Sequence, residues 1–397
     1  MNRSIHEKVK RQTVQLSGML PVYLIIFFSF FDTHAQMPIL APYASTLGAT
    51  PFIIGIVVGA YSFFNITGNL TSGIWIDRTN WKLPLFTGLA GVSVILALYP
   101  QAGSTTILIL IRAAHGYMGG ILVPAALACL TNRTNAEGQN KNLAVFGAAI
   151  GLAAVTGPVF AGIVANNYGY TTVYYSMAGM MATATIFSYM SLYRQNQLPC
   201  SQVKPLISFR LISGKPHIRS AFFYALGTMG STGTLASFLP TKTAMLDLNP
   251  AETGLLFATF ALTAIAVQVA WPSFFKALFR EDHRGGAVGL LILSFALTLA
   301  ASAPSARVLF LALVLFGTGF GFSFQGMLGL VISGSDLEWR GRAIGLFFAV
   351  YSLGVAAVPP LSGLIWQNIS IFFPFYTAAF IALCCMAAGY KIIQVKK

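Results

Sequence analysis

Charge is scarce in this sequence of 397 residues. Only 9% of the residues are charged and ten are acidic, whereas 56% are hydrophobic. Because a soluble domain carries about 25% charged residues, we expect an integral membrane protein. No stretch outside the apolar runs is long enough for a soluble nucleotide-binding domain, and no GxxxxGK[ST] loop occurs, which argues against an ATP-driven pump.

Cysteine is also scarce, with four residues in the whole chain. Cys384 and Cys385 are adjacent in an apolar run, Cys129 lies in another, and Cys200 lies in a polar stretch. This spacing indicates neither a disulfide framework nor a metal site. Since no cofactor loop accompanies them either, we expect no enzyme activity, no metal and no cofactor.

Apolar runs of about 20 residues, the length that crosses a bilayer, recur along the chain. They lie at about 16–43, 51–76, 83–101, 104–131, 142–165, 171–193, 218–241, 251–275, 285–303, 306–333, 343–366 and 371–393. About twelve transmembrane helices are therefore predicted. The first run resembles a secretory leader, but we expect it to be kept, because its removal would leave an odd number of spans.

The basic residues predict the orientation of these spans. With the N-terminus inside, all 24 Lys and Arg residues except Arg112, Lys242 and Arg307 fall at the chain ends or in gaps on the cytoplasmic side, as the positive-inside rule requires. We therefore expect a multi-pass protein of the plasma (inner) membrane with both termini cytoplasmic. The net charge of +14 is scattered over these gaps, so it forms no patch for nucleic acid.

Two segments of the chain recur about 200 residues apart. Glu137, Lys141, Pro158 and Gly162 correspond to Glu338, Arg342, Pro359 and Gly363 at an offset of 201, and Pro51 and Gly55 correspond to Pro250 and Gly254 at an offset of 199. Duplicated transporters hold their substrate between the two halves. We predict one six-helix bundle over residues 1–193, a cytoplasmic linker over 194–217 and a second six-helix bundle over 218–397.

Three motifs resemble those of a known family. Residues 73–82, GIWIDRTNWK, resemble the G-xxx-D-R-x-G-R-K signature of the major facilitator superfamily. Asn80 stands at the usual glycine, and we expect the turn to form because Asn tolerates left-handed backbone. Arg112 to Gly120, RAAHGYMGG, is similar to the R-xx-Q-G-x-G motif of the drug/proton antiporters, with His115 in place of Gln. The glycines and the proline of residues 147–162 are similar to the antiporter motif of that group.

The resemblance implies an all-α membrane protein of about 12 helices in two pseudo-symmetric six-helix bundles, the major facilitator fold. It also implies alternating access, proton-coupled export of a small lipophilic or amphipathic molecule, and a monomer within the lipid bilayer. A proton-linked importer and a carrier of metallophores or other metabolites share parts of these motifs and remain alternatives. A non-transporting membrane receptor or scaffold is the alternative of another class.

Charge inside the spans is the sharpest functional signal, because an ionised side chain at the bilayer centre costs at least about 2.5–3.5 kcal/mol. Span one carries Asp32, and span four carries Arg112 and His115. A rise of about 1.5 Å per residue places Asp32 and His115 at similar depth, with Arg112 about one turn further out. His34 lies on another face of span one and is expected to be structural.

Desolvation favours the protonated form of a carboxyl group, so Asp32 is the predicted proton carrier. Arg112 would tune it by charge, and His115 would relay protons or bind substrate. The alternative is a permanent ion pair between Asp32 and Arg112 that only fixes helix packing.

The remaining candidates fall into two groups. The predicted substrate-binding residues are Asp32, Gln36, Asn65, His115, Phe238, Gln268, Phe324 and Gln325. The phenylalanines could instead face lipid or pack. The predicted gating residues are Gly73, Asp77, Arg78, Lys82, Gly147, Gly151, Gly157, Pro158, Gly162, Arg340 and Arg342. The family pattern implies that Asp77 faces the start of span eleven, where the helix dipole favours a carboxylate, and latches the cytoplasmic side. A charge cluster that only sets topology is the alternative.

Overall fold

The computed structural model describes residues 20–131, 136–192, 209–275, 282–336, 338–370 and 373–394. Within these ranges every regular element is a helix. Most of the predicted linker, Arg133, and Lys276 to Arg280 lie outside them, and the side chains of Glu137 and Lys141 are likewise not described.

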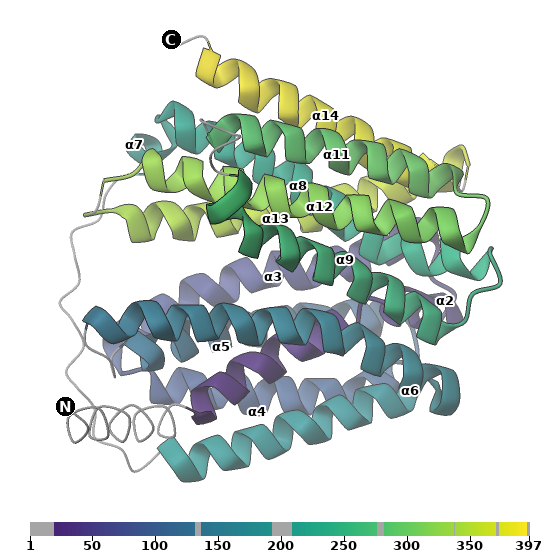
Figure 1. Cartoon of the computed structure of the whole chain (residues 1–397). Helices are drawn as coiled ribbons and strands as arrows, with labels where there is room; N and C mark the ends of the chain where they lie inside the picture. Colours follow the sequence, from purple (N-terminus) through teal and green to yellow (C-terminus); the bar gives the residue numbers. More distant parts are fainter. Residues whose placement is uncertain are drawn as a thin grey trace, which may run out of the picture.

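The helices form two bundles that lie one above the other in Figure 1. The first bundle contains the helix Leu20–Ala35, α2 (Leu40–Thr46), α3 (Pro51–Arg78), α4 (Lys82–Leu98) with η1 (Tyr99–Gln101), α5 (Thr105–Thr131) and α6 (Ala136–Leu192). After α7 (Phe209–Ser213), the second contains α8 (Pro216–Ala244), α9 (Pro250–Ala270) with η2 (Trp271–Phe275), α11 (Asp282–Ser302), α12 (Ala306–Ser333), α13 (Arg340–Asn368) and α14 (Phe373–Gln394).

The described helices account for the twelve predicted spans. Nine are long and apolar enough to cross a membrane, and Leu20–Ala35 with α2 makes a tenth span that is bent by 49°. Helix α6 contains two spans, because Gly169, with φ 81° and ψ 168°, interrupts it. Helix α8 is the twelfth; its 29 residues are long enough, but its many Ser and Thr residues lower its hydropathy. The predicted fold class is confirmed.

The repeat appears first in how two equivalent helices begin. Helix α3 starts with Pro51 after Thr50, whose hydroxyl accepts a hydrogen bond from the backbone N–H of Ile53. Helix α9 starts with Pro250 after Asn249, which forms a capping box with Glu252. In both places a capping side chain accepts an N–H that has no partner within the helix, and proline supplies the helical φ of the first position.

The repeat appears again where the two bundles touch, along α3 with α13 and α6 with α9. A Cβ added at Gly55 would lie 2.5 Å from the carbonyl oxygen of Pro359, and one at Gly254 would contact the carbonyl oxygen of Pro158. The reciprocal contacts join Gly363 to Pro51 and Gly162 to Pro250. Four of the matched pairs therefore occupy equivalent positions in the two contacts between the bundles: Pro51 and Pro250, Gly55 and Gly254, Pro158 and Pro359, and Gly162 and Gly363.

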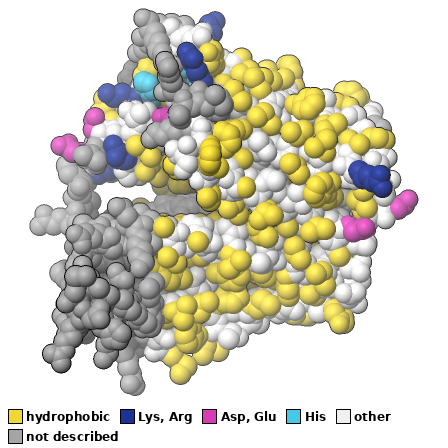
Figure 2. Space-filling view, in the orientation of Figure 1, with side chains coloured by type: hydrophobic (Ala, Val, Ile, Leu, Met, Phe, Trp, Pro, Cys, Tyr) yellow, Lys and Arg dark blue, Asp and Glu magenta, His cyan; other side chains and the backbone are white. Residues whose placement is uncertain are grey.

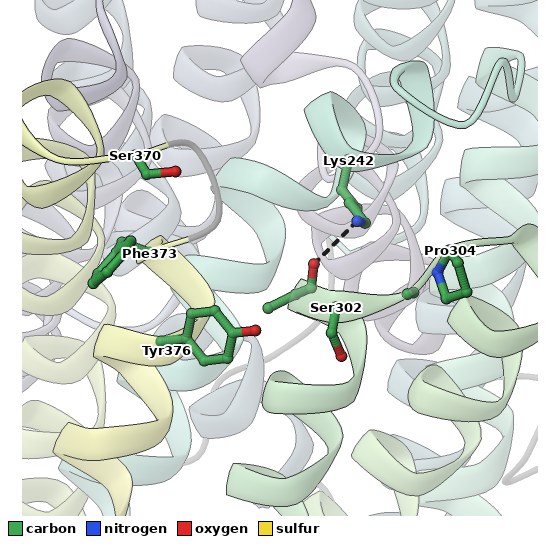
Figure 3. Close-up of a pocket in the computed structure, with 8 residues that line it drawn as sticks. Lys242, Ser302, Pro304, Ser370, Phe373 and Tyr376 are labelled. Carbon is green, nitrogen blue, oxygen red and sulfur yellow. Dashed lines mark hydrogen bonds between the residues drawn. The ribbon is translucent and has the colours of Figure 1, made fainter.

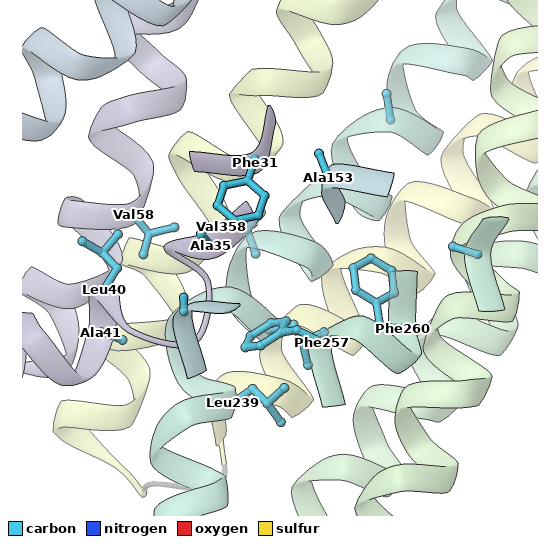
Figure 4. Packing of buried hydrophobic residues seen from close by; sticks show 14 of the residues in the cluster. Phe31, Ala35, Leu40, Ala41, Val58, Ala153, Leu239, Phe257, Phe260 and Val358 are labelled. Carbon is cyan, nitrogen blue, oxygen red and sulfur yellow. The ribbon is translucent and has the colours of Figure 1, made fainter. Parts of the chain in front are cut away.

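These contacts lie toward one end of the bundles. We call the end with Pro51 and Pro250 the closed end, and the end with Arg78 and Arg340 the open end. At the closed end apolar side chains of both bundles meet, among them Phe31 and Val58 from the first and Val358, Phe257 and Leu239 from the second (Figure 4).

Toward the open end the same helices have room beside them. A Cβ at Gly73 on α3, Gly147 on α6, or Gly341 and Gly345 on α13 would meet nothing within 4 Å. Figure 2 shows a recess between the two bundles at this end. The bundles are therefore in contact at one end and apart at the other.

Candidate functional site

A buried cluster of polar side chains lies inside the first bundle. Asp32 comes from the first helix, Tyr99 from η1, and Arg112 and His115 from α5; Gln36 lies in the turn of residues 36–39 that bends span one. Each of the five is at most 5% exposed. Polar groups buried this far from water need partners within the protein.

A chain of three contacts joins four of these groups. Asp32 Oδ2 lies 3.0 Å from Nε2 of His115, whose Nδ1 lies 3.0 Å from the Tyr99 hydroxyl. That hydroxyl accepts a hydrogen bond from Arg112 Nη1 at 3.2 Å. Because a guanidinium can only donate, Arg112 donates to Tyr99, and the tautomer of His115 sets which atoms donate in the other two contacts.

Arg112 is held mainly by neutral groups. Its Nη1 donates to Oε1 of Gln36 at 2.8 Å, its Nε donates to the backbone oxygen of Val57 at 3.2 Å, and its Cζ lies 4.8 Å from the ring centre of Tyr61. Within the described residues Asp32 has its 3.0 Å side-chain contact with His115 and not with Arg112. The direct pair between Asp32 and Arg112 that the sequence left open is therefore not formed.

Two hydroxyl groups from half-buried residues lie next to Asp32. Thr33 Oγ1 donates to Asp32 Oδ1 at 2.9 Å and lies 3.3 Å from the Tyr61 hydroxyl. The Tyr61 ring also meets the His115 ring edge to face at 5.1 Å. Asp32 and His115 themselves are closed off in this conformation, so direct contact with a substrate requires the bundle to open. Their role in substrate binding stays a prediction.

The glycines of α5 explain how α5 comes so close to α3. A Cβ at Gly116 or Gly120 would contact the backbone oxygen of Tyr61 or Asn65, respectively. Asn65, predicted to bind substrate, donates from Nδ2 to the oxygen of Gly116 at 3.3 Å. It is half-buried and joins the two helices.

Sequence reasoning missed Tyr99, Tyr61 and Thr33. None carries a charge or belongs to a motif, so only their position in the bundle marks them. Tyr99 also stacks on Tyr174, with ring centres 4.5 Å apart and planes within 8°, and its backbone oxygen accepts a hydrogen bond from the Tyr43 hydroxyl at 2.7 Å. These contacts fix the position of the Tyr99 hydroxyl between Arg112 and His115.

The predicted substrate residues of the second bundle separate into two kinds. Phe324, Gln325 and Gln268 are half-buried, and the Phe324 ring lies parallel to Phe320 at 6.0 Å. Phe238 is only 1% exposed and packs against Trp366 at 5.3 Å. Phe238 is therefore a packing residue in this structure and not part of a cavity wall.

Asp77 and Arg78 do not form the predicted latch in this conformation. Both are exposed at the end of α3, and Asp77 makes no ion pair with a described residue. Arg340 instead donates from Nη2 to the backbone oxygen of Ser335 at 3.3 Å. This agrees with the separation of the bundles at the open end.

The turn before α4 differs from the sequence expectation. Among the described residues other than glycine, only Asp247 has a positive φ, so Asn80 is not left-handed. Its side-chain oxygen instead accepts the backbone N–H of Lys82 at 2.8 Å, which supports the start of α4. The Lys82 ammonium lies 5.9 Å from the Trp81 ring centre.

The glycines of α6 make two kinds of close contact. A Cβ at Gly157 would lie 2.8 Å from the backbone oxygen of Phe31, so this glycine lets α6 pack against span one beside Asp32. Gly162 contacts Pro250 across the bundle interface, and Gly151 faces only the Ile265 side chain at 3.2 Å.

A fold of two repeated helical bundles that meet at one end, with a buried polar cluster, defines a membrane transporter of the duplicated type. The sequence profile of the Major Facilitator Superfamily matches residues 22–354 and 221–396. The chain belongs to this family, as its motifs indicated.

The similar proteins have names that point to different functions. The chain is 22% identical over 343 residues to an uncharacterised MFS-type transporter of Methanocaldococcus jannaschii, covering 84% of this chain and 87% of the relative. It is 26% identical over 212 residues to multidrug resistance protein MdtG of Serratia proteamaculans, covering 51% of each. It is 24% identical over 274 residues to sodium-dependent phosphate transport protein 1, chloroplastic, of Arabidopsis thaliana, covering 62% and 53%.

Two solved structures have the same fold. One is a bacterial homolog of the human lysosomal transporter Spinster, inward-facing and occupied, with a TM-score of 0.76 and 15% identity over 97% of this chain and 95% of that one. The other is the nucleoside transporter NupG, with a TM-score of 0.77 and 14% identity over 96% and 100%. At such identities the likeness shows the fold alone.

Proposed function

We propose that this protein is a secondary transporter that exports a small amphipathic organic molecule in exchange for protons, by alternating access. The observation that carries the proposal is the contact of 3.0 Å between Asp32 and His115 inside the first bundle. Ionisable groups buried within transmembrane helices are costly and mark proton relays and ion pathways. The partial likeness to MdtG supports export of a drug-like compound.

Charge balance suggests how proton binding drives the change in conformation. With Asp32 ionised and His115 neutral, the negative charge of Asp32 balances the positive charge of Arg112. A proton taken up by Asp32 removes that balance and reverses the hydrogen bond to His115, which must then accept at Nε2. The buried Arg112 is left as a net positive charge, which favours hydration of the cluster and separation of its helices.

The open end is the proposed cytoplasmic end, and the structure would then be the inward-facing state. Basic residues gather there, namely Arg78, Lys82, Arg219, Arg284, Arg340, Arg342 and Lys391. Lys242 and Arg307 lie at the other end. The positive-inside rule therefore favours cytoplasmic termini and a plasma (inner) membrane location. Gly55 and its equivalents allow the close contact that would seal the outer side.

The proposed substrate site lies between the bundles. Phe320, Phe324 and Tyr351 form a half-buried aromatic group, and the amide of Gln325 is half-buried beside them with no hydrogen bond to a described residue. Binding pockets combine apolar and aromatic walls with a few polar groups that fix orientation. An amphipathic organic molecule matches this lining.

The test uses Asp32→Asn in proteoliposomes with an imposed pH gradient and a substrate first found by thermal-shift screening at two pH values. Asn keeps the shape and can still pair with His115, so the variant should fold but lose the pH dependence of transport. Asp247→Asn is the matched control, because Asp247 is exposed and Asn accepts its positive φ. Wild-type pH dependence in Asp32→Asn would end the proposal.

The direction of transport is tested separately. Under an imposed pH gradient, an exporter that exchanges protons should move substrate against the direction of proton flow, whereas an importer that carries protons with its substrate moves both the same way. Reversing the gradient should reverse the movement in either case. A receptor or scaffold would show no flux in either orientation, and neither Asp32→Asn nor Arg112→Gln would change it.

A further inference from the structure

The first helix, which carries Asp32 and His34, lies inside the protein. From Pro21 to Ala35 every residue is buried or half-buried. A helix at the lipid surface differs, since on α9 the side chains of Leu262 and Val269 are 59% and 74% exposed. A half-buried side chain of the first helix therefore borders a space within the protein, and His34 is one of these side chains.

The space beside His34 lies between the two bundles. Phe31, three residues earlier, faces Phe257 of the second bundle in Figure 4, and residues three apart are neighbours on the surface of a helix. On the other side of His34 lies α6, where a Cβ added at Gly157 would be 3.4 Å from the His34 Cβ. His34 thus lies at the junction of the first helix, α6 and the second bundle.

One hydrogen bond fixes the His34 ring. Its Nδ1 lies 2.7 Å from the backbone oxygen of Phe30, and because a carbonyl oxygen can only accept, Nδ1 carries a hydrogen and donates it. In the neutral ring Nε2 then offers a lone pair. Side chains of a helix point toward its start, so the ring extends from His34 toward the open end.

The Nε2 atom of His34 is accessible and has an aromatic surrounding. It makes no hydrogen bond to a described residue, and it is not one of the fully buried polar atoms that lack a partner. The ring of Phe30 lies 6.4 Å from that of His34 and 6.4 Å from that of Phe146 on α6. Phe30 and Phe146 are half-buried as well. A single acceptor held in an apolar wall is the kind of group that orients a bound molecule.

A cavity of about 480 Å³ at the closed end of the second bundle is a different space (Figure 3). It lies where the end of α8, the end of α11 and the start of α14 meet, and Lys242 there donates to the backbone oxygen of Ala301 at 3.0 Å. None of its described lining residues belongs to the first helix. The space beside His34 is therefore separate from it.

We propose that His34 binds the transported molecule, and that its Nε2 accepts a hydrogen bond from an O–H or N–H group of that molecule. The proposal rests on the proposed transport function and narrows its substrate class to lipophilic compounds that carry such a donor. It replaces the structural role that the sequence led us to expect for His34. Unlike Asp32 and His115, this residue can meet the substrate without any opening of the first bundle.

Chemical modification tests whether Nε2 is free. Diethyl pyrocarbonate ethoxycarbonylates an imidazole nitrogen that offers a lone pair, and peptide mass spectrometry locates the product. His217 is exposed and serves as the reactive control, whereas His115 is 1% exposed and serves as the protected one. His34 should be modified under conditions that modify His217 and spare His115. Protection of His34 equal to that of His115 would overturn the proposal.

A pair of probes tests the hydrogen bond itself. Indole carries one N–H donor, and N-methylindole has the same ring system without it. Their binding to the protein in phosphatidylcholine nanodiscs is measured by equilibrium dialysis without a pH gradient, after subtraction of binding to empty nanodiscs. The wild type should bind indole roughly 2- to 12-fold more tightly than N-methylindole, the effect of one neutral hydrogen bond.

Three variants assign this preference to one residue. His34→Phe keeps a ring but removes the acceptor, so the preference for indole should disappear. His34→Gln should retain part of it, because the amide oxygen can accept, and this variant also serves if His34→Phe does not fold. His217→Phe makes the same exchange at an exposed position and should behave as the wild type.

Equal binding of the two probes by the wild type, including no binding of either, would refute the role of His34, and so would an unchanged preference in His34→Phe. These outcomes are distinct from failure of the transport proposal, because the dialysis requires no flux. Flux that depends on pH in the wild type but not in Asp32→Asn, together with no preference for indole, would reject the His34 site alone.

Discussion

Gly55 offers a direct test of whether the closed end opens during transport. In Gly55→Ala the new Cβ would lie 2.5 Å from the oxygen of Pro359 and 2.6 Å from the Cα of Pro360. Both are backbone atoms, which cannot rotate away as a side chain could. Ordinary contact begins at 3.4 Å, so α3 and α13 must separate by about 0.9 Å.

The cost of that separation sets the size of the effect. Overpacking of this kind costs about 1–3 kcal/mol, and only the conformation with a closed end bears it. The equilibrium should therefore shift toward opening of this end by roughly 5- to 150-fold. Gly345→Ala on α13 is the control, since its Cβ would meet nothing within 4 Å.

Labelling of a single cysteine measures this shift. Val58→Cys, in a background without the native cysteines, places a thiol of similar size at a position that is 7% exposed at the closed end. A membrane-impermeant maleimide should label this cysteine faster with Gly55→Ala than with Gly345→Ala. The ratio of the two labelling rates should match the factor above as long as the closed state dominates. Equal labelling rates would show that the contact at Gly55 does not hold this end closed.

Two further substitutions test the buried cluster and the helix start. Tyr99→Phe should lower the unfolding free energy by about 1–3 kcal/mol, because it leaves His115 without its partner at Nδ1. Tyr174→Phe should be neutral, since the Tyr174 hydroxyl has no partner among the described residues. Thermal unfolding of both variants checks this, and equal losses of stability would contradict it. Asn249→Ala removes one bond of the capping box with Glu252 and should lower the unfolding free energy by about 0.5–2 kcal/mol. Its unfolding temperature should therefore be lower than that of Asp247→Asn. An unchanged unfolding temperature would contradict a stabilising role of this cap.

Some of the site could be predicted because depth in a membrane follows directly from chain position. Each helical residue advances the chain by a fixed rise, so Asp32 and His115 could be placed at one depth, and the structure puts them in contact. Their common depth did not reveal which groups pair. His115, and not Arg112, meets Asp32 because the rotation of α5 turns Arg112 toward Gln36 and Tyr99.

The sequence alone determined the class of protein, the number of spans and the duplication. The hydrocarbon layer demands apolar runs of fixed length, and the repeated Gly and Pro residues mark the two contacts between bundles because only small side chains permit so close an approach. Tertiary structure alone decided which end is closed, that Phe238 is buried in packing, and that Tyr99 links Arg112 to His115. These depend on how helices tilt and rotate against one another, which the order of residues along one helix does not record.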